Sequence, residues 1–340
     1  RILSPIYHGR LLTGGEAFWD EGREPGYRNG PLNTRIRTYK LARRMNNIAF
    51  AYTPSPLEAA EAMAFNLDCL GCICWFEYGR LAAKPGVETA VSLELAPYIR
   101  FFHDRRDLLR NAEVVADVAI LRSFPSQVYA EAAQAQLTAQ TEQFLIENRV
   151  PFQIIYDGHL SELSQYRALV LAGCVAMSDA QIEQVRSFAA GGGRVLLVGD
   201  AATHDEWLIP RKTPGLANLP QAQLVRIQNA TDLGRAVGAL LQAPPSLTVE
   251  GPSGLCAELT EQPGRRLVHL VNYRTDTPAR NINVTVQLPK GEPVKSVRLA
   301  RPEHDKDVNL EIRWQEKAIT CVVPAIDVYG IVVVTWDTPK

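Results

Sequence analysis

Two short stretches of the chain combine acidic and aromatic side chains. Residues 14–21 read Gly-Gly-Glu-Ala-Phe-Trp-Asp-Glu, and residues 75–79 read Trp-Phe-Glu-Tyr-Gly. We expect each stretch to lie at the carboxyl end of a short strand, formed by residues 10–13 and 69–76. Aromatic rings stack on sugars, and a pair of carboxylates cleaves a glycosidic bond. The pattern therefore predicts a carbohydrate site where (β/α)8 barrels carry their active sites, at the carboxyl ends of parallel strands.

Glu16 and Glu77 are the candidate catalytic carboxylates. Glu16 ranks first because it follows the predicted strand through two glycines and precedes Phe18 and Trp19. The candidate substrate-binding residues are Trp19, Asp20, Glu21, Trp75 and Tyr78. The competing interpretation is that each is an ordinary loop acid or a half-buried aromatic side chain, since both are common in globular proteins.

The composition sets limits on the class of protein. In 340 residues, 46% are hydrophobic and 21% charged, which is typical of a globular chain and excludes a disordered or fibrous one. The formal net charge is −1, so we expect neither nucleic acid nor an anionic membrane as a partner. The chain begins with Arg1, and we expect it to be a processed chain or the C-terminal part of a longer one.

Strand and helix patterns alternate through residues 1–116. The expected strands are residues 10–13, 48–52 and 69–76, and the expected helices are residues 31–46, 57–65 and 93–111. This alternation predicts βα units of a parallel sheet or barrel. Glu58 and Glu61 lie on the second of these helices, where we expect them to face solvent.

Residues 117–243 continue the α/β alternation with stronger signals. The expected strands are residues 117–122, 152–156, 168–173 and 194–199, and a helix is expected at residues 130–148. Ser178 is followed three residues later by Gln181, which predicts a capping box at the start of a helix that ends at the glycines 191–193. The pattern predicts a doubly wound α/β domain.

From residue 244 to residue 340 the hydrophobic period changes to two. Six strands are expected, at residues 266–272, 281–288, 294–299, 309–314, 318–323 and 330–335. Short strands at this spacing, with no helix between them, predict a small antiparallel β-sandwich.

Other chemistries are weakly supported. No glycine-rich phosphate loop follows a strand, because the glycines 191–193 come after a helix. Cys174 follows a strand, as a thiol nucleophile would, but it lacks a sharp elbow and a histidine partner, which favours a small buried side chain. Cys69, Cys72 and Cys74 have zinc-like spacing without a second ligand pair, so core packing is favoured there too. We expect all six cysteines to be reduced and unligated, and we expect no cofactor and no bound metal.

Residues 169–196, LVLAGCVAMSDAQIEQVRSFAAGGGRVL, resemble the trimerisation domain of family 42 glycoside hydrolases, the β-galactosidases. The segments 267–273, 297–299 and 323–329 look like the small sandwich that follows that domain in the family. The resemblance implies the end of a (β/α)8 barrel at residues 1–116, a flavodoxin- or amidotransferase-like trimerisation domain at 117–243, and a β-sandwich at 244–340. It also implies a homotrimer.

The resemblance further implies a retaining glycosidase that uses two Glu residues. The first of these would lie upstream of Arg1, and at the second expected position the chain has Ala51 and Tyr52 before a family-like Thr53-Pro54-Ser55. The nucleophile would then be Glu16 or Glu77. We expect the C-terminal portion of a β-galactosidase-like hydrolase of a carbohydrate substrate, completed by the rest of the barrel upstream or on another chain. The alternative is a non-catalytic assembly or carbohydrate-binding protein with the same architecture.

Overall fold

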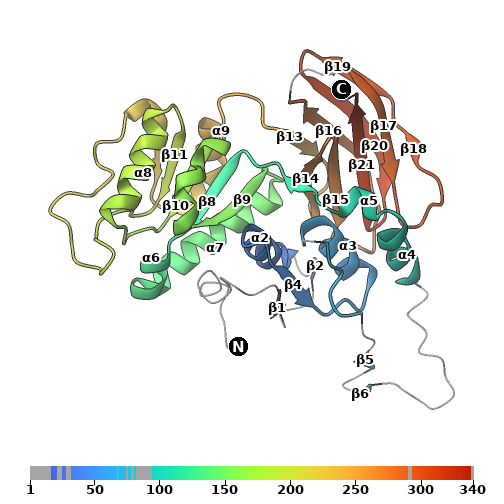
Figure 1. Ribbon diagram of the computed structural model, residues 1–340, viewed down its shortest axis with the longest axis horizontal. Helices are drawn as coiled ribbons and strands as arrows, with labels where there is room; N and C mark the ends of the chain where they lie inside the picture. The colour runs from blue at the N-terminus through green and yellow to red at the C-terminus, as the bar shows by residue number, and fades with distance from the viewer. Residues whose placement is uncertain are drawn as a thin grey trace. The chain divides into compact units, whose positions relative to one another are not determined.

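The computed structural model describes residues 17–20, 25–27, 32–66, 68–73, 76–77, 80–81, 94–289 and 293–337 (Figure 1). For residues 17–20, 76–77, 80–81 and 131–134 it describes the backbone alone. The fold is mixed α/β with several sheets. Contacts divide the chain into two units, one that contains residues 116–246 and one that joins residues 14–115 to residues 247–340. We call them the parallel unit and the antiparallel unit.

The parallel unit is built on a sheet of five parallel strands. These are β8 (Val118–Arg122), β9 (Phe152–Tyr156), β10 (Ala168–Ala172), β11 (Arg194–Val198) and β12 (Leu224–Ile227), and their order is β12-β11-β10-β8-β9. This is the flavodoxin-like order, with the switch point between β8 and β10. The helices are α6 (Phe124–Tyr129), α7 (Glu131–Glu147), α8 (Asp179–Ala190) and α9 (Leu233–Leu240), with 3-10 turns η1 (Asp157–Gln165), η2 (Gln221–Gln223) and η3 (Ala230–Asp232).

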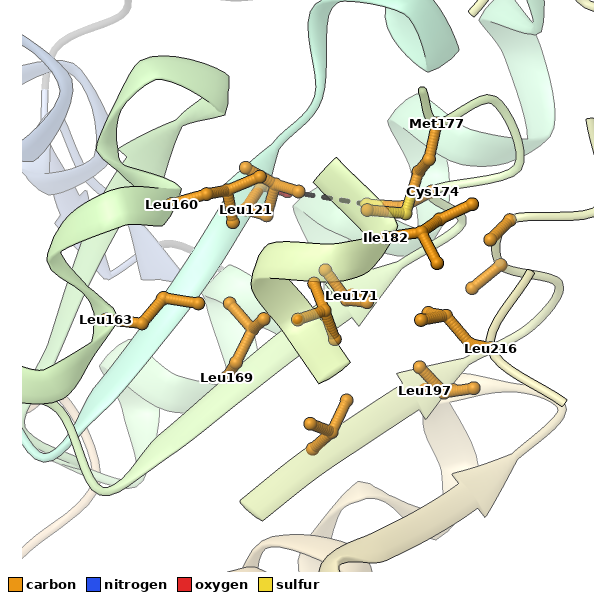
Figure 2. Packing of buried hydrophobic residues seen from close by; sticks show 14 of the residues in the cluster. Leu121, Leu160, Leu163, Leu169, Leu171, Cys174, Met177, Ile182, Leu197 and Leu216 are labelled. Carbon is orange, nitrogen blue, oxygen red and sulfur yellow. Dashed lines mark hydrogen bonds between the residues drawn. The ribbon is translucent and has the colours of Figure 1, made fainter. Parts of the chain in front are cut away.

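Apolar side chains hold η1 and α8 against one face of this sheet (Figure 2). Leu160 and Leu163 of η1 and Ile182 of α8 pack with Leu171 and Leu197 of the central strands, and all are buried. The predicted capping box at α8 is confirmed: the Ser178 hydroxyl accepts from the Gln181 N–H at 3.3 Å, and the Gln181 side chain accepts from the Ser178 N–H at 2.7 Å. Local sequence signals therefore specify this layer well.

The antiparallel unit contains two sheets that share one apolar core. One has the order β13-β16-β20-β19, and the other has the order β18-β17-β21-β15-β14-β7. The strands are β7 (Glu113–Val114), β13 (Leu247–Glu250), β14 (Leu255–Gln262), β15 (Arg265–Asn272), β16 (Ala279–Gln287), β17 (Val294–Ala300), β18 (Val308–Asn309), β19 (Ile312–Gln315), β20 (Ala318–Ile326) and β21 (Tyr329–Trp336). Val284 and Ile319 of the first sheet belong to the same buried cluster as Val268 and Val332 of the second.

The expectation of six strands for this region was too low. β13 and β14 were not predicted, and the predicted strand 309–314 is divided into β18 and β19. In β14, Leu255, Ala257 and Leu259 face the apolar core, while Glu258 and Thr260 lie on the opposite face, which is buried as well. β7 comes from before the parallel unit and pairs with β14, a partner that is remote in sequence.

Residues 17–109 supply the remaining elements of the antiparallel unit. They are β1 (Ala17–Asp20), β2 (Gly26–Tyr27), β3 (Leu32–Asn33), α2 (Ile36–Arg44), β4 (Ile48–Ala51), α3 (Pro56–Phe65), β5 (Phe76–Glu77), β6 (Arg80–Leu81), α4 (Ala96–Asp104) and α5 (Arg106–Leu109). β1 and β4 are parallel neighbours. The predicted helix 93–111 is two helices that meet at Arg105.

The predicted strand 69–76 is wrong for the residues that the structure describes. Cys72 forms a single parallel bridge with Tyr52, and Phe76 begins a two-residue strand that pairs antiparallel with β6. An apolar run alone cannot distinguish a strand from buried irregular chain. The predicted strand 10–13 lies outside the described residues. No helix in the described ranges is long and apolar enough to cross a bilayer.

Candidate functional site

The predicted acids and aromatics are only partly described by the structure. Glu16, Glu21, Trp75 and Tyr78 lie outside the described residues. Trp19 and Asp20 lie in β1, and Glu77 lies in β5 opposite Arg80. Trp19 and Asp20 are thus part of a strand, whereas the sequence suggested a loop after one. Their roles, like those of Glu16 and Glu77, stay predictions.

Three parallel segments meet where the candidate site is expected. Asp20, the last residue of β1, is in register with Ala51, the last residue of β4, and Tyr52 is bridged to Cys72. The carboxyl ends of the segments therefore lie side by side, which is the arrangement that brings site residues together in parallel sheets. Of these three segments, β1 is the one that ends in an acidic residue, Asp20. The sequence pattern ranked it only as a substrate contact.

Backbone hydrogen bonds hold these ends closely together. The Cys72 N–H donates to the Ala51 carbonyl at 2.7 Å, and the Thr53 N–H donates to the Cys72 carbonyl at 2.9 Å. Gly71 has φ +88°, and a Cβ there would lie 2.3 Å from the Ala51 carbonyl oxygen. Glycine is required at this position both by its left-handed conformation and by the close approach of β4. The Arg35 guanidinium also donates to the Tyr52 carbonyl at 2.8 Å.

The expectation that Glu58 and Glu61 face solvent is wrong. Their exposed fractions are 5% and 0%. Every residue of α3 after Pro56 is buried, because the helix packs against β14 and β15 of the six-stranded sheet as well as against α2 and α4. The many alanines of α3 were the available signal, since a helix that is small and apolar on all sides is usually enclosed.

Glu61 connects the helices to the antiparallel sheet. One carboxylate oxygen accepts from the Arg35 N–H at 2.7 Å and from the Tyr273 hydroxyl at 2.5 Å, and the Thr34 hydroxyl donates to the same oxygen. Burial raises the pKa of Glu61, and these hydrogen bonds act in the opposite direction. The carboxylate thereby satisfies the N–H of Arg35, the residue before α2, and ties α2 to Tyr273, which directly follows β15.

A second buried contact joins Lys40 of α2 to Glu258 of β14. The ammonium group lies 2.8 Å and 2.6 Å from the two carboxylate oxygens, and the side chains are 2% and 5% exposed. Burial lowers the pKa of Lys40 and raises that of Glu258, while attraction between the two charges opposes both shifts. Glu61 and Glu258 are thus buried acids, which tie α2 to α3 and to the antiparallel sheet.

Nearby, His269 of β15 contacts the Tyr329 hydroxyl at 2.8 Å and the Thr260 hydroxyl at 3.1 Å. Burial lowers the pKa of His269 to about 3, so the ring is neutral at ordinary pH. A neutral histidine with both ring nitrogens engaged is a core side chain.

In the parallel unit, a loop of the protein itself occupies the sheet edge at which such folds usually bind ligands. In sheets of this order a ligand binds at the carboxyl ends of the strands beside the switch point. Here the hydroxyl of Ser126, at the start of α6, donates to the Ala176 carbonyl at 2.7 Å, and the Ala176 N–H donates back to it at 2.9 Å. The loop after β10 therefore fills the place that a ligand would take.

Cys174 is part of that filling. It is fully buried among Leu121, Met177 and Ile182, and its thiol donates weakly to the Leu121 carbonyl at 3.7 Å (Figure 2). Burial raises the pKa of the thiol well above its usual value. A nucleophilic cysteine needs the opposite shift, so the structure supports the small buried side chain and excludes an amidotransferase-type reaction at this residue.

Within the described ranges, no group of three or more metal-ligating side chains converges. Cys69, Cys72, Cys174 and Cys321 are free thiols, and Cys74 lies outside the described residues.

No family model matches the sequence, and no curated protein does. Solved structures are similar in fold. An α-L-fucosidase isoenzyme from Paenibacillus thiaminolyticus aligns with a TM-score of 0.70 and 18% identity over 97% of this chain and 66% of its own. Gan42B, a GH42 β-galactosidase from G. stearothermophilus, aligns with a TM-score of 0.56 and 12% identity over 98% of this chain and 56% of its own. A rhamnosidase from Novosphingobium sp. PP1Y aligns with a TM-score of 0.56 and 17% identity over 95% of this chain and 34% of its own.

The fold is therefore glycoside-hydrolase-like, and it is shared with GH42 β-galactosidases among other glycosidases. The chain spans between about a third and two thirds of the length of these enzymes.

Proposed function

We propose that this chain is the C-terminal part of a retaining, β-galactosidase-like glycoside hydrolase. The observation that carries the proposal is the likeness of nearly the whole chain to part of several glycosidases. In this proposal residues 1–116 are the last βα units of a (β/α)8 barrel, residues 117–243 are the trimerisation domain, and residues 244–340 are the β-sandwich. The rest of the barrel comes from upstream or from another chain, and the assembly is a homotrimer.

Retaining hydrolysis needs a nucleophilic carboxylate and a proton donor about 5–5.5 Å apart. The chain supplies one of them, with Glu16 as first choice and Glu77 as second. Trp19, Asp20, Glu21, Trp75 and Tyr78 would contact the sugar. The parallel pairing of β1 with β4 supports the region chosen, because it brings their carboxyl ends together.

The sugar specificity of the proposed enzyme should be tested on several glycosides. The fucosidase aligns with a higher TM-score, 0.70, than the GH42 β-galactosidase, 0.56. We therefore propose a panel of aryl glycosides with β-D-galactosyl, α-L-fucosyl and α-L-rhamnosyl groups. The enzyme with its completed barrel should cleave one of them, and NMR of the first product should show retained anomeric configuration.

Three substitutions identify the carboxylate. Glu16→Gln, Glu77→Gln and Asp20→Asn are compared with Glu311→Gln, which removes an exposed acid of the antiparallel unit. Loss of about 10³-fold or more in kcat in one of the three, with Glu311→Gln unchanged, would assign the residue. Wild-type turnover in all three would overturn the proposed site.

A non-catalytic assembly or carbohydrate-binding protein is the second candidate. One observation favours it: β4 ends in Ala51 and continues into Tyr52 and Thr53, where the family resemblance places a catalytic Glu. Sugar binding by calorimetry, with no cleavage by the completed protein, would favour this candidate.

A further inference from the structure

The loop of residues 203–211, which follows β11 in the parallel unit, exposes two large apolar side chains. Trp207 is 68% exposed and Ile209 is 60% exposed. The Asp205 carboxylate accepts from both of their backbone N–H groups, at 3.0 Å and 2.9 Å. An exposed tryptophan held by an ordered backbone is typical of the anchor residues of protein interfaces. We call this segment the Trp207 loop.

The loop is also fixed to the rest of the unit. Arg211 pairs with Asp179 at 2.6 Å and donates to the Met177 carbonyl at 2.8 Å. The Arg211 N–H donates to the Thr203 carbonyl at 2.9 Å and closes the base of the loop. Trp207 is thus presented in advance of any binding, which reduces the entropy that docking would cost.

A groove of about 940 Å³ runs between η1 and α8 of the same unit. Its lining is mostly apolar and includes Leu160, Tyr166, Phe188 and the glycines 191–193. The volume is near the upper end of the range of about 300–1,000 Å³ that is usual for binding sites, so it has room for Trp207 and Ile209 together. We call it the α8 groove.

Arg167 and Arg194 line the α8 groove at the amino ends of β10 and β11, and Glu183 of α8 lines it as well. Arg167 is paired with Asp117 at 3.3 Å. Arg194 also lines the groove, and its Nε is buried without a hydrogen-bond partner among the described residues. An acidic group brought into the groove would meet this guanidinium, and the Trp207 loop carries Glu206 next to Trp207.

We propose that the Trp207 loop of one copy of this chain docks in the α8 groove of a second copy. Trp207 and Ile209 fill the apolar part beside Phe188, and Glu206 faces Arg194. The loop follows the carboxyl end of β11, whereas the groove reaches its amino end, so the contact joins two different surfaces. Repeated head to tail, a contact of this kind closes into a ring. The inference rests on the proposed homotrimer and names its interface.

Sedimentation velocity of the whole chain at micromolar concentration tests the loop. The wild type should associate, and Trp207→Ser should weaken association about 30-fold or more, as expected for a tryptophan anchor. Trp314→Ser is the matched control, because Trp314 is a 44% exposed tryptophan of the antiparallel unit and should have no effect. Unchanged association of Trp207→Ser would overturn the docking.

A mixing experiment tests the direction of the contact. Ser187→Trp should fill the groove and block docking, while Ser187→Ala should not. The Trp207→Ser and Ser187→Trp chains should each be monomeric alone and should form a 1:1 dimer when mixed, since one intact loop and one intact groove remain. Absence of that dimer would contradict a head-to-tail contact.

Charge reversal tests the polar part. Arg194→Glu should weaken association about tenfold, and adding Glu206→Arg should restore it.

A monomeric wild type would overturn the homotrimer and the docking together. An oligomer insensitive to both Trp207→Ser and Ser187→Trp would overturn the docking alone, and neither result depends on the glycosidase assay.

Discussion

The two units bury charge in different ways. In the parallel unit, Arg122 and Glu142 form a buried bidentate pair, with N···O distances of 2.7 Å and 2.5 Å, between residues 20 positions apart. In the antiparallel unit, Lys40 pairs with Glu258, 218 positions away, and Glu61 accepts from Tyr273, 212 positions away. The parallel unit otherwise relies on an apolar cluster drawn from neighbouring βα repeats.

The two units differ in how far along the sequence the partners of their buried groups lie. A repeating βα unit can bury its sheet with helices from the same stretch of sequence. The segment with β4, α2 and α3 instead depends on sheet strands more than 200 residues later for the partners of its buried polar groups. We infer that the antiparallel sheets act as the support of the candidate site, because they hold α2, which packs against β4.

Breaking the remote pair should have the largest effect. Lys40→Met leaves Glu258 buried without its partner and should lower the free energy of unfolding at pH 7 by about 3–5 kcal/mol. The double variant Lys40→Met, Glu258→Leu should recover most of that loss, because it removes both charges. Urea unfolding of the two variants and the wild type measures this. A single variant as stable as the wild type would show that the pair is dispensable.

Truncating the apolar core of the parallel unit should have a slightly smaller effect. Leu171 is fully buried, and Leu171→Ala should cost about 3 kcal/mol from lost burial and the cavity left behind. The loss should not depend on pH, in contrast to that of Lys40→Met, which should shrink at low pH as Glu258 is protonated. Unfolding at pH 5 and pH 7 distinguishes the two kinds of core.

Glu61→Gln should change the pH dependence of stability by about 1 kcal/mol. Burial raises the pKa of Glu61 in the folded state, so its contribution to stability is present at low pH and is lost as the pH rises through the folded-state pKa. The amide imitates the protonated acid. The two proteins should therefore have similar unfolding free energies below about pH 4, where glutamate is protonated in the unfolded state too, and the variant should become relatively more stable at higher pH. Parallel pH profiles would contradict the raised pKa.

The smallest expected effect belongs to a purely local contact. Ser178→Ala removes the side-chain oxygen that caps α8 and should cost about 1 kcal/mol, while Ser178→Asp should retain most of the stability. Thermal unfolding of the parallel unit within the whole chain measures both. A loss as large as that of Lys40→Met would mean that the cap does more than satisfy a helix terminus.

The sequence determined what depends on neighbours along the chain. The apolar runs that became β10 and β11, the cap of α8, and the period of two in β16 and β20 are local patterns, and the structure contains the corresponding elements. The same patterns indicated Cys174 as a small buried side chain, which its environment confirms. The resemblance in residues 169–196 indicated the glycoside-hydrolase-like fold that the solved structures support.

Tertiary structure alone decided the features that depend on remote partners. Glu58 and Glu61 look like surface acids in sequence, and the alanines around them indicate only an enclosed helix, not that a remote sheet covers α3. The apolar run 69–76 looks like a strand, but Cys72 has only a single bridge, and Gly71 is fixed by the approach of β4. Burial and pairing of this kind are set by contacts more than 200 residues apart or by backbone packing, and neither leaves a periodic signal in the sequence.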